Sequence, residues 1–82
     1  MTFTLSRLLD DAGNRVRKPE TIKGATLDVD RHGHASAFVD EKLVADLDMM
    51  RFEAHANGLY LYGYERIGKR VQAQNWFLAY ES

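Results

Sequence analysis

The stretch Arg51–Tyr80, RFEAHANGLYLYGYERIGKRVQAQNWFLAY, decides the fold of this chain. It holds seven of the nine aromatic residues, and its apolar and polar side chains alternate as they do in strands with one buried face. Two short glycine-containing segments, Asn57-Gly58 and Ile67–Arg70, interrupt the alternation. The stretch therefore predicts three antiparallel strands joined by two tight turns.

Asn57-Gly58 between alternating runs is a strong signal for a two-residue hairpin turn. The register that follows places Ala56 opposite Leu59. One face of the predicted hairpin is then wholly apolar, and we expect it to line the core with five side chains: Phe52, Ala54, Ala56, Leu59 and Leu61.

The opposite face of the same hairpin carries a row of tyrosines with basic side chains beside it. We predict a binding surface there, formed by six residues: Arg51, His55, Tyr60, Tyr62, Tyr64 and Arg66. Tyrosine and arginine dominate the energetics of protein interfaces. Small barrels that bind single-stranded nucleic acid also stack bases on aromatic rings and hold phosphates with arginine. A third interpretation is that the tyrosines pack beneath a loop.

The net charge of -1 weighs against nucleic acid, because phosphate contacts supply most of that affinity. The sequence therefore favours a non-enzymatic domain that binds an unknown protein partner or a second copy of itself. A single-stranded nucleic-acid-binding barrel is the alternative.

The face that the last strand buries depends on the length of the loop at Ile67–Arg70. An even loop places Gln72, Gln74, Trp76, Leu78 and Tyr80 on the core face and adds Phe77 to the tyrosine row. An odd loop, or a bulge, buries Val71, Ala73, Phe77 and Ala79 instead. We favour the even loop because burying Trp76 removes the largest apolar area from water.

The first half of the chain predicts shorter strands, over Phe3–Leu9, Thr21–Arg31 and His34–Val39. A two-residue turn at His32-Gly33 pairs Leu27 with Phe38. A short return strand at Arg15–Lys18 is also expected, limited by the proline that follows it.

The segment from Lys42 to Met50 is compatible with two structures. Alternating Leu43, Ala45, Leu47 and Met49 favour a strand, whereas Leu43, Leu47, Met50 and Ala54 also stand at helical spacing. We expect an all-β fold, a small antiparallel meander of five to six strands forming a barrel or half-barrel. An α+β domain with one helix around residues 40–56 is the alternative. Residues 1–82 form a single small domain, for which a second copy would add buried apolar surface.

The composition excludes several classes of site. With no cysteine, the chain has no disulfide, no thiolate metal site and no cysteine nucleophile. The start of the chain lacks the basic and apolar regions of a signal peptide, and no apolar run has membrane-spanning length. We predict a cytoplasmic protein with no membrane contact.

Two groups of polar residues are candidates for chemistry. Asp28, Asp30, His32 and His34, with His55 elsewhere, are possible metal ligands, but their spacing matches no metal motif and we predict no metal or cofactor. Glu53, His55 and Glu65 could supply an acid–base pair, and Ser6 and Ser36 lack a nucleophile motif. We predict that the protein is not an enzyme, with a small metal-dependent hydrolase as the weaker alternative.

The segment Gly58–Glu65, GLYLYGYE, followed by Ala73–Trp76, AQNW, resembles short uncharacterised proteins of bacterial plasmids and prophages. The resemblance covers about the last third of the chain and consists of a hairpin pattern. It implies an accessory role in a mobile element, and it brings no named family, activity or site residue with it.

Overall fold

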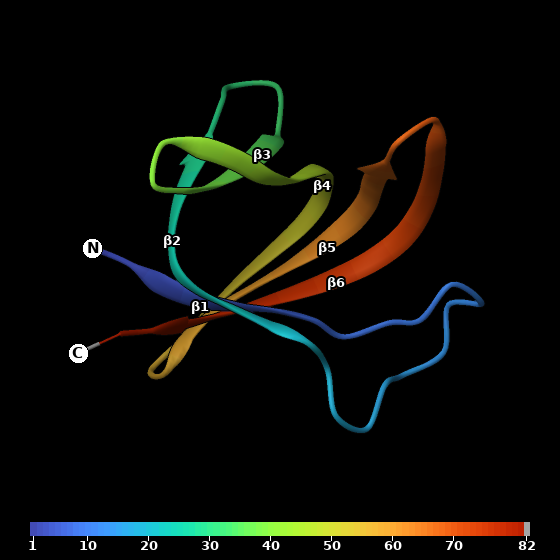
Figure 1. Ribbon diagram of the computed structural model, residues 1–82, viewed down its shortest axis with the longest axis horizontal. Coiled ribbons are helices and arrows are strands. Elements are labelled where there is room, and N and C mark those ends of the chain that lie inside the picture. Colours follow the sequence, from blue (N-terminus) through green and yellow to red (C-terminus); the bar gives the residue numbers. More distant parts are fainter. Residues whose placement is uncertain (82) are drawn as a thin grey trace.

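The computed structural model describes residues 1–81, which form an all-β barrel (Figure 1). Its strands are β1 (Phe3–Arg7), β2 (Thr21–Val29), β3 (His34–Val39), β4 (Lys42–His55), β5 (Gly58–Ile67) and β6 (Arg70–Tyr80). Each strand pairs antiparallel with the next, and β1 also pairs with β6, which closes the barrel. The predicted antiparallel meander is confirmed.

The alternative helix around residues 40–56 is wrong, because those residues belong mainly to β4. Ala45 and Leu47 are buried at two-residue spacing, as a strand with one inward face requires. Within residues 1–81 there is no helix that could span a membrane.

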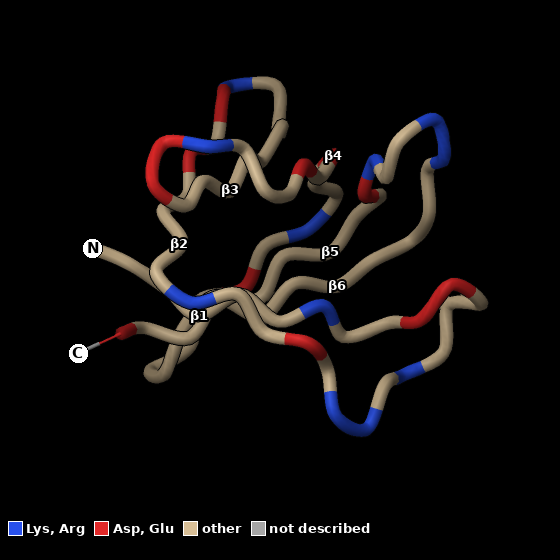
Figure 2. The backbone as a smooth tube through the Cα atoms, viewed as in Figure 1, with Lys and Arg blue, Asp and Glu red and all other residues tan. Residues whose placement is uncertain are grey.

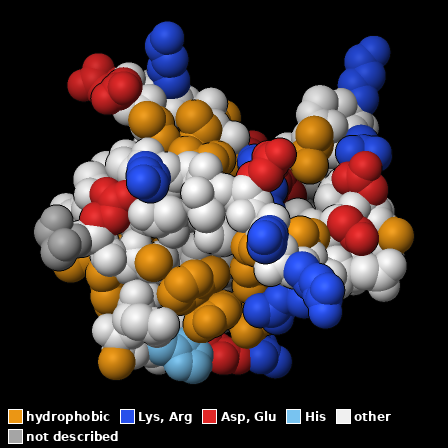
Figure 3. All heavy atoms as spheres, turned by 60° about the horizontal axis from the view of Figure 1, so that its bottom comes forward, with side chains coloured by type: hydrophobic (Ala, Val, Ile, Leu, Met, Phe, Trp, Pro, Cys, Tyr) orange, Lys and Arg blue, Asp and Glu red, His pale blue; other side chains and the backbone are white. Residues whose placement is uncertain are grey.

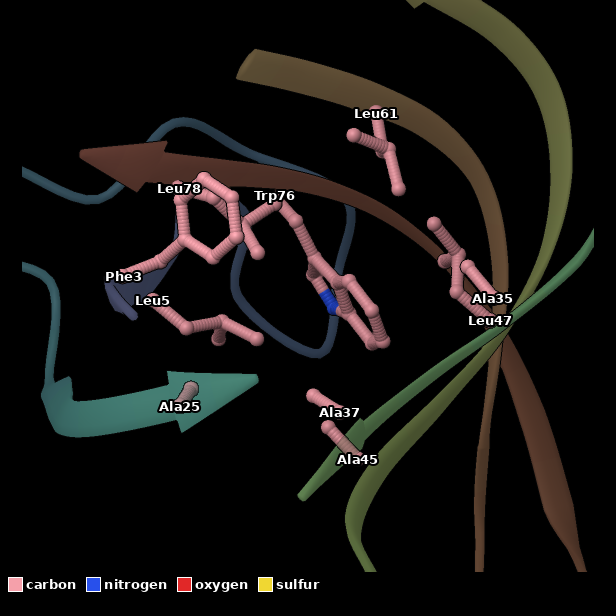
Figure 4. Packing of buried hydrophobic residues seen from close by; sticks show 10 residues of the cluster. All are labelled: Phe3, Leu5, Ala25, Ala35, Ala37, Ala45, Leu47, Leu61, Trp76 and Leu78. Carbon is pink, nitrogen blue, oxygen red and sulfur yellow. The ribbon is translucent and has the colours of Figure 1, made fainter. Parts of the chain in front are cut away.

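The core is built around Trp76, which is fully buried. The indole reaches from β6 toward Ala37 and Ala45 on the opposite wall, where small side chains leave room for it (Figure 4). Leu5, Leu47, Leu61 and Leu78, all with no exposed surface, contribute the other large buried groups. The predicted burial of Trp76 is therefore confirmed.

The turn between β5 and β6 decides the inward face of β6. Ile67 pairs with Arg70 across the two-residue loop Gly68-Lys69, and Gly68 has a φ of +64°. Glycine at the first loop position is typical of a type II′ turn, whose twist suits a hairpin. This even loop pairs Trp76 with Leu61 and so places Trp76 on the core face, as predicted.

The turn between β4 and β5 lies one residue earlier than predicted. The loop is Ala56-Asn57, and Gly58 opens β5 opposite His55. A Cβ on Gly58 would lie 2.2 Å from the carbonyl oxygen of Leu78. The glycine is therefore required for the close approach of β6. The pairing shifts by two residues, so that Ala54 faces Leu59, and a two-residue shift leaves the two faces unchanged.

A β-bulge at Met50 changes which residues of β4 point inward. Met49 pairs with Gly63 and Arg51 pairs with Tyr62, so Met50 is the extra residue. Directly before this bulge the inward side chains have odd numbers, Ala45 and Leu47; after it the even-numbered residues lie on that face.

The predicted burial of Phe52, Ala54 and Ala56 is wrong. Phe52 is 49% exposed, and both alanines are exposed. β3 pairs with β4 only as far as Asp48, so within residues 1–81 no strand lies beside this end of β4 on that side. Leu61 is buried and Leu59 packs against the core, as predicted.

The hairpin of β2 and β3 has a register one residue away from the prediction. Leu27 pairs with Ala37 rather than with Phe38. The carboxylate of Asp30 accepts the backbone N–H groups of His32 and His34 at 2.8 and 2.9 Å, which stabilises a longer turn.

The connection from β1 to β2 holds less regular structure than predicted. Among the described residues, the expected return strand at Arg15–Lys18 is reduced to a single bridge between Leu9 and Arg15. Pro19, which cannot donate to a sheet, lies close behind it.

Candidate functional site

The outer side of β4, β5 and β6 carries the row of aromatic side chains that the alternation predicts. We define the tyrosine face as the six predicted residues and Phe77: Arg51, His55, Tyr60, Tyr62, Tyr64, Arg66 and Phe77. These residues lie on the strand faces opposite the buried Leu61 and Trp76.

Four aromatic side chains of this face are in contact with one another. The ring of Tyr60 stacks on Phe77 at 4.6 Å and on Tyr62 at 6.4 Å between centroids, and His55 meets Tyr60 edge-on at 5.0 Å. Such contacts are worth about 0.5–1.5 kcal/mol each beyond the area they bury. They fix the orientation of the rings on the sheet.

Charged groups continue the cluster along β4. The guanidinium of Arg51 lies 4.5 Å above the ring of Tyr62, a cation–π contact. Glu53 accepts hydrogen bonds from Arg51 and pairs with His55 at 3.1 Å. The hydrogen bonds from His55 and Arg51 lower the pKa of the Glu53 carboxyl, and the bond to Glu53 raises the pKa of Arg51. The sequence made Glu53 a candidate for acid–base chemistry and did not include it in the predicted binding surface. Its position between Arg51 and His55 on alternate residues was the missed signal.

The other end of the face is more open. Tyr64 is 49% exposed and pairs across the strands with Asp48 on β4 and Ala73 on β6. Arg66 lies two residues further along β5, with its guanidinium 3.7 Å from the carboxylate of Asp48. The structure thus brings the predicted residues into one row, in which Arg51 stands opposite Tyr62.

The surface view shows hydrophobic side chains gathered beside a histidine, with acidic and basic side chains along their margin (Figure 3). A cavity of about 630 Å³ lies elsewhere, between the β1–β2 connection and the residues Arg7, Ile67, Gln72 and Gln74 of the barrel. No residue of the tyrosine face lines that cavity. The tyrosine face therefore presents a surface to its surroundings that is distinct from this cavity.

The residues considered for acid–base chemistry are not brought together. Glu65 is 1% exposed inside the barrel, where it binds Arg7 and Trp76. Glu53 and His55 lie on the outer side.

The residues considered for metal binding are used in the turn and on the outside of β3 and β4. Asp30 caps the β2–β3 turn, and hydrogen bonds from the backbone of His34 and His32 lower the pKa of its carboxyl. The ring of His34 contacts Asp46 and lies 3.0 Å from Asp48. Within residues 1–81, no group of three or more histidine or carboxylate side chains could hold a metal ion.

Comparison with known proteins finds no family model, no curated protein and no solved structure that matches this chain.

Proposed function

We propose that this chain is a non-enzymatic protein-binding domain of the cytoplasm, and that its tyrosine face contacts the partner protein. The observation that carries the proposal is the row of outward aromatic rings on β5 and β6. Tyr60, Tyr62 and Phe77 are partly buried and stacked on one another, and Tyr64 beside them is 49% exposed. Tyrosine and arginine are enriched at the energetic centres of protein interfaces.

The rings are already oriented before a partner arrives. Tyr60 is held by Phe77 and His55, and Tyr62 is held by Tyr60 and Arg51. A surface whose side chains are fixed in advance loses less conformational entropy on binding. Tyrosine also adds contact area while having only two rotatable bonds before its hydroxyl.

The charges on the face favour a protein over a nucleic acid. Arg51 is paired with Glu53, and Arg66 lies beside Asp48. A phosphate backbone would have to displace these carboxylates. The remaining Lys and Arg residues are dispersed over strands, turns and the β1–β2 connection (Figure 2).

Affinity capture with the tagged chain, followed by mass spectrometry, tests the proposal. We expect proteins that are retained by the wild-type chain to be lost with Tyr62→Ala and Tyr64→Ala. Leu43→Ala is the matched control, because Leu43 is an apolar side chain, 56% exposed, outside the tyrosine face. Circular dichroism should show that all three variants are folded.

Two results would count against this function. One is partner capture that the tyrosine variants leave unchanged. The other is binding of a labelled oligonucleotide at low salt that falls steeply as salt is added, which would indicate phosphate contacts instead.

A further inference from the structure

One end of β4 has a strand edge that no neighbour covers among the described residues. β3 pairs with β4 from Lys42 to Asp48, and Met49 adds one hydrogen bond to Gly33 at 2.8 Å. From there to His55, β4 pairs only with β5. An uncovered strand edge is a template for pairing with another strand.

The backbone groups of this edge are directed away from the barrel at alternate residues. His55 and Gly58 flank a two-residue loop and pair directly, so His55, Glu53 and Arg51 direct their N–H and C=O groups toward β5. Phe52 and Ala54, the residues between them, direct theirs outward.

Phe52 and Ala54, whose N–H and C=O groups are directed outward, have apolar side chains, and so does Met50 beside them. Met50 is 74% exposed and Phe52 is 49% exposed. Between and beside them stand Arg51, 65% exposed, and Glu53, 35% exposed. The segment Met50–Ala54 therefore reads apolar, positive, apolar, negative, apolar.

That order is complementary to itself when two copies run antiparallel. With Phe52 opposite the same residue of a second copy, Arg51 of each copy stands opposite Glu53 of the other, and Met50 stands opposite Ala54. Opposite charges directly across two strands stabilise their pairing, and like charges destabilise it. A two-fold axis repeats every contact, so the pair of Arg51 with Glu53 of the other copy occurs twice in this arrangement.

We propose that Met50–Ala54 is a dimerisation edge, at which β4 pairs antiparallel with β4 of a second copy of this chain. The two barrels then share one continuous sheet, and the pairing covers Met50 and Phe52. The edge lies beside the tyrosine face and shares Arg51 with it, so one dimer presents two tyrosine faces. This inference does not depend on the proposed function.

Exchange of the two charges tests the edge. Arg51→Glu places glutamate opposite Glu53 of the second copy, and Glu53→Arg places arginine opposite Arg51. We expect each single variant to raise the dimer dissociation constant about tenfold or more. The double variant, Arg51→Glu with Glu53→Arg, should dimerise as the wild type does, because the complementary order is restored.

Mixing the two single variants gives the sharpest result. Each variant places like charges opposite one another in its own dimer. An Arg51→Glu chain and a Glu53→Arg chain, by contrast, place opposite charges against each other at both positions. Sedimentation velocity should therefore show monomers in the separate samples and heterodimers in the mixture. A misfolded variant could not produce this recovery.

The inference is overturned if the wild-type chain stays monomeric at millimolar concentration, if the single variants dimerise as tightly as the wild type, or if their mixture dimerises no more tightly than the separate samples. Tyr64→Ala is the control for the neighbouring surface and should leave the dimer intact. Loss of the dimer in Tyr64→Ala would move the self-association to the tyrosine face and overturn the edge.

Discussion

Glu65 is the residue on which the polar interior of the barrel depends. The Nε–H of Arg7 donates to both oxygens of the Glu65 carboxylate, at 2.9 Å each. The indole N–H of Trp76 donates to Oε1 at 2.8 Å. Arg7 adds a second nitrogen at 2.7 Å. Charge-assisted bonds of this kind compensate the desolvation of a carboxylate that is 1% exposed.

Replacing Arg7 should therefore be more damaging than its partly exposed position suggests. Arg7→Met leaves the buried carboxylate without its cation, and we expect a loss of about 3 kcal/mol in the free energy of unfolding. Arg7→Met with Glu65→Gln removes the charge but keeps an acceptor for Trp76, so it should recover at least about 1 kcal/mol of that loss. Urea denaturation measures both. An equal loss in the two variants would contradict this role of Glu65.

Glu81 connects the two ends of the described chain. Its carboxylate accepts the hydroxyls of Thr2 and Thr4 at 2.6 and 2.8 Å and the backbone N–H of Gly24 at 2.8 Å. The bonds from Thr2, Gly24 and Thr4 lower the pKa of this carboxyl below its ordinary value of 4.5. The folded state therefore favours the charged form.

A group with a lowered pKa stabilises the fold above its ordinary pKa and loses that contribution as pH falls through the folded-state value. We expect Glu81→Gln to be less stable than the wild type at neutral pH, with a difference that shrinks below pH 4.5. Thr4→Val, which removes one donor, should move the acid loss of stability to higher pH. Thermal unfolding across this range provides the measurement, and a difference that stays constant on acidification would argue against the charged contacts.

At the scale of elements, the β3–β4 turn is strained. Asp40 and Glu41 have φ values of +50° and +67°, in the left-handed region that a type I′ turn requires. A residue with a side chain pays roughly 1–2 kcal/mol there, and glycine does not.

Glu41→Gly should therefore raise the free energy of unfolding by about 1 kcal/mol. Glu41→Ala is the matched control, because it removes the same charge and keeps the Cβ. Chemical denaturation of both variants separates strain from charge. If alanine stabilises as much as glycine does, the strain at this turn is not the cause.

The sequence predicts best the strands that are joined by a turn with a recognisable turn residue, such as glycine. Gly68 sets the face of β6. β3 has the predicted bounds, His34–Val39, but its register against β2 differs from the prediction by one residue. Alternation alone also locates the tyrosines of β5 on one face, because a register error of two residues preserves the faces. Which residues of β4 and β6 stand opposite those tyrosines could be learned only from the observed register.

Two of the errors are local, at the β2–β3 and β4–β5 turns. The wrong burial of the end of β4 concerns a contact between distant segments. Nothing local in Phe52 or Ala54 shows that β3 stops pairing before it reaches them. The bulge at Met50 shifts the inward positions of β4 from odd to even numbers. Of the residues at helical spacing only Leu47 is buried, whereas Leu43, Met50 and Ala54 are exposed, so that spacing marks no buried face. Gly63 belongs to the same region, since a Cβ there would lie 2.0 Å from the carbonyl oxygen of Asp48.

At the scale of the whole molecule, the inward side chains of the barrel form its core, and the outward side chains form the proposed binding surface. Leu61 of β5 and Trp76 of β6 fill the interior, while Tyr60, Tyr62 and Tyr64 stand on the outer side of β5. A closed barrel this small needs all of its inward side chains for stability. The outward rings are then available for binding.

The free energy of unfolding of Tyr64→Ala, compared with Leu61→Ala, tests this separation most directly. Leu61 is fully buried, and its truncation should cost about 2–5 kcal/mol. Tyr64 is half exposed, and its truncation should stay within about 0.5 kcal/mol of the wild type. Urea denaturation of the two variants gives both values. A loss in Tyr64→Ala as large as that in Leu61→Ala would show that the tyrosine row supports the fold, and would contradict its assignment as a binding surface.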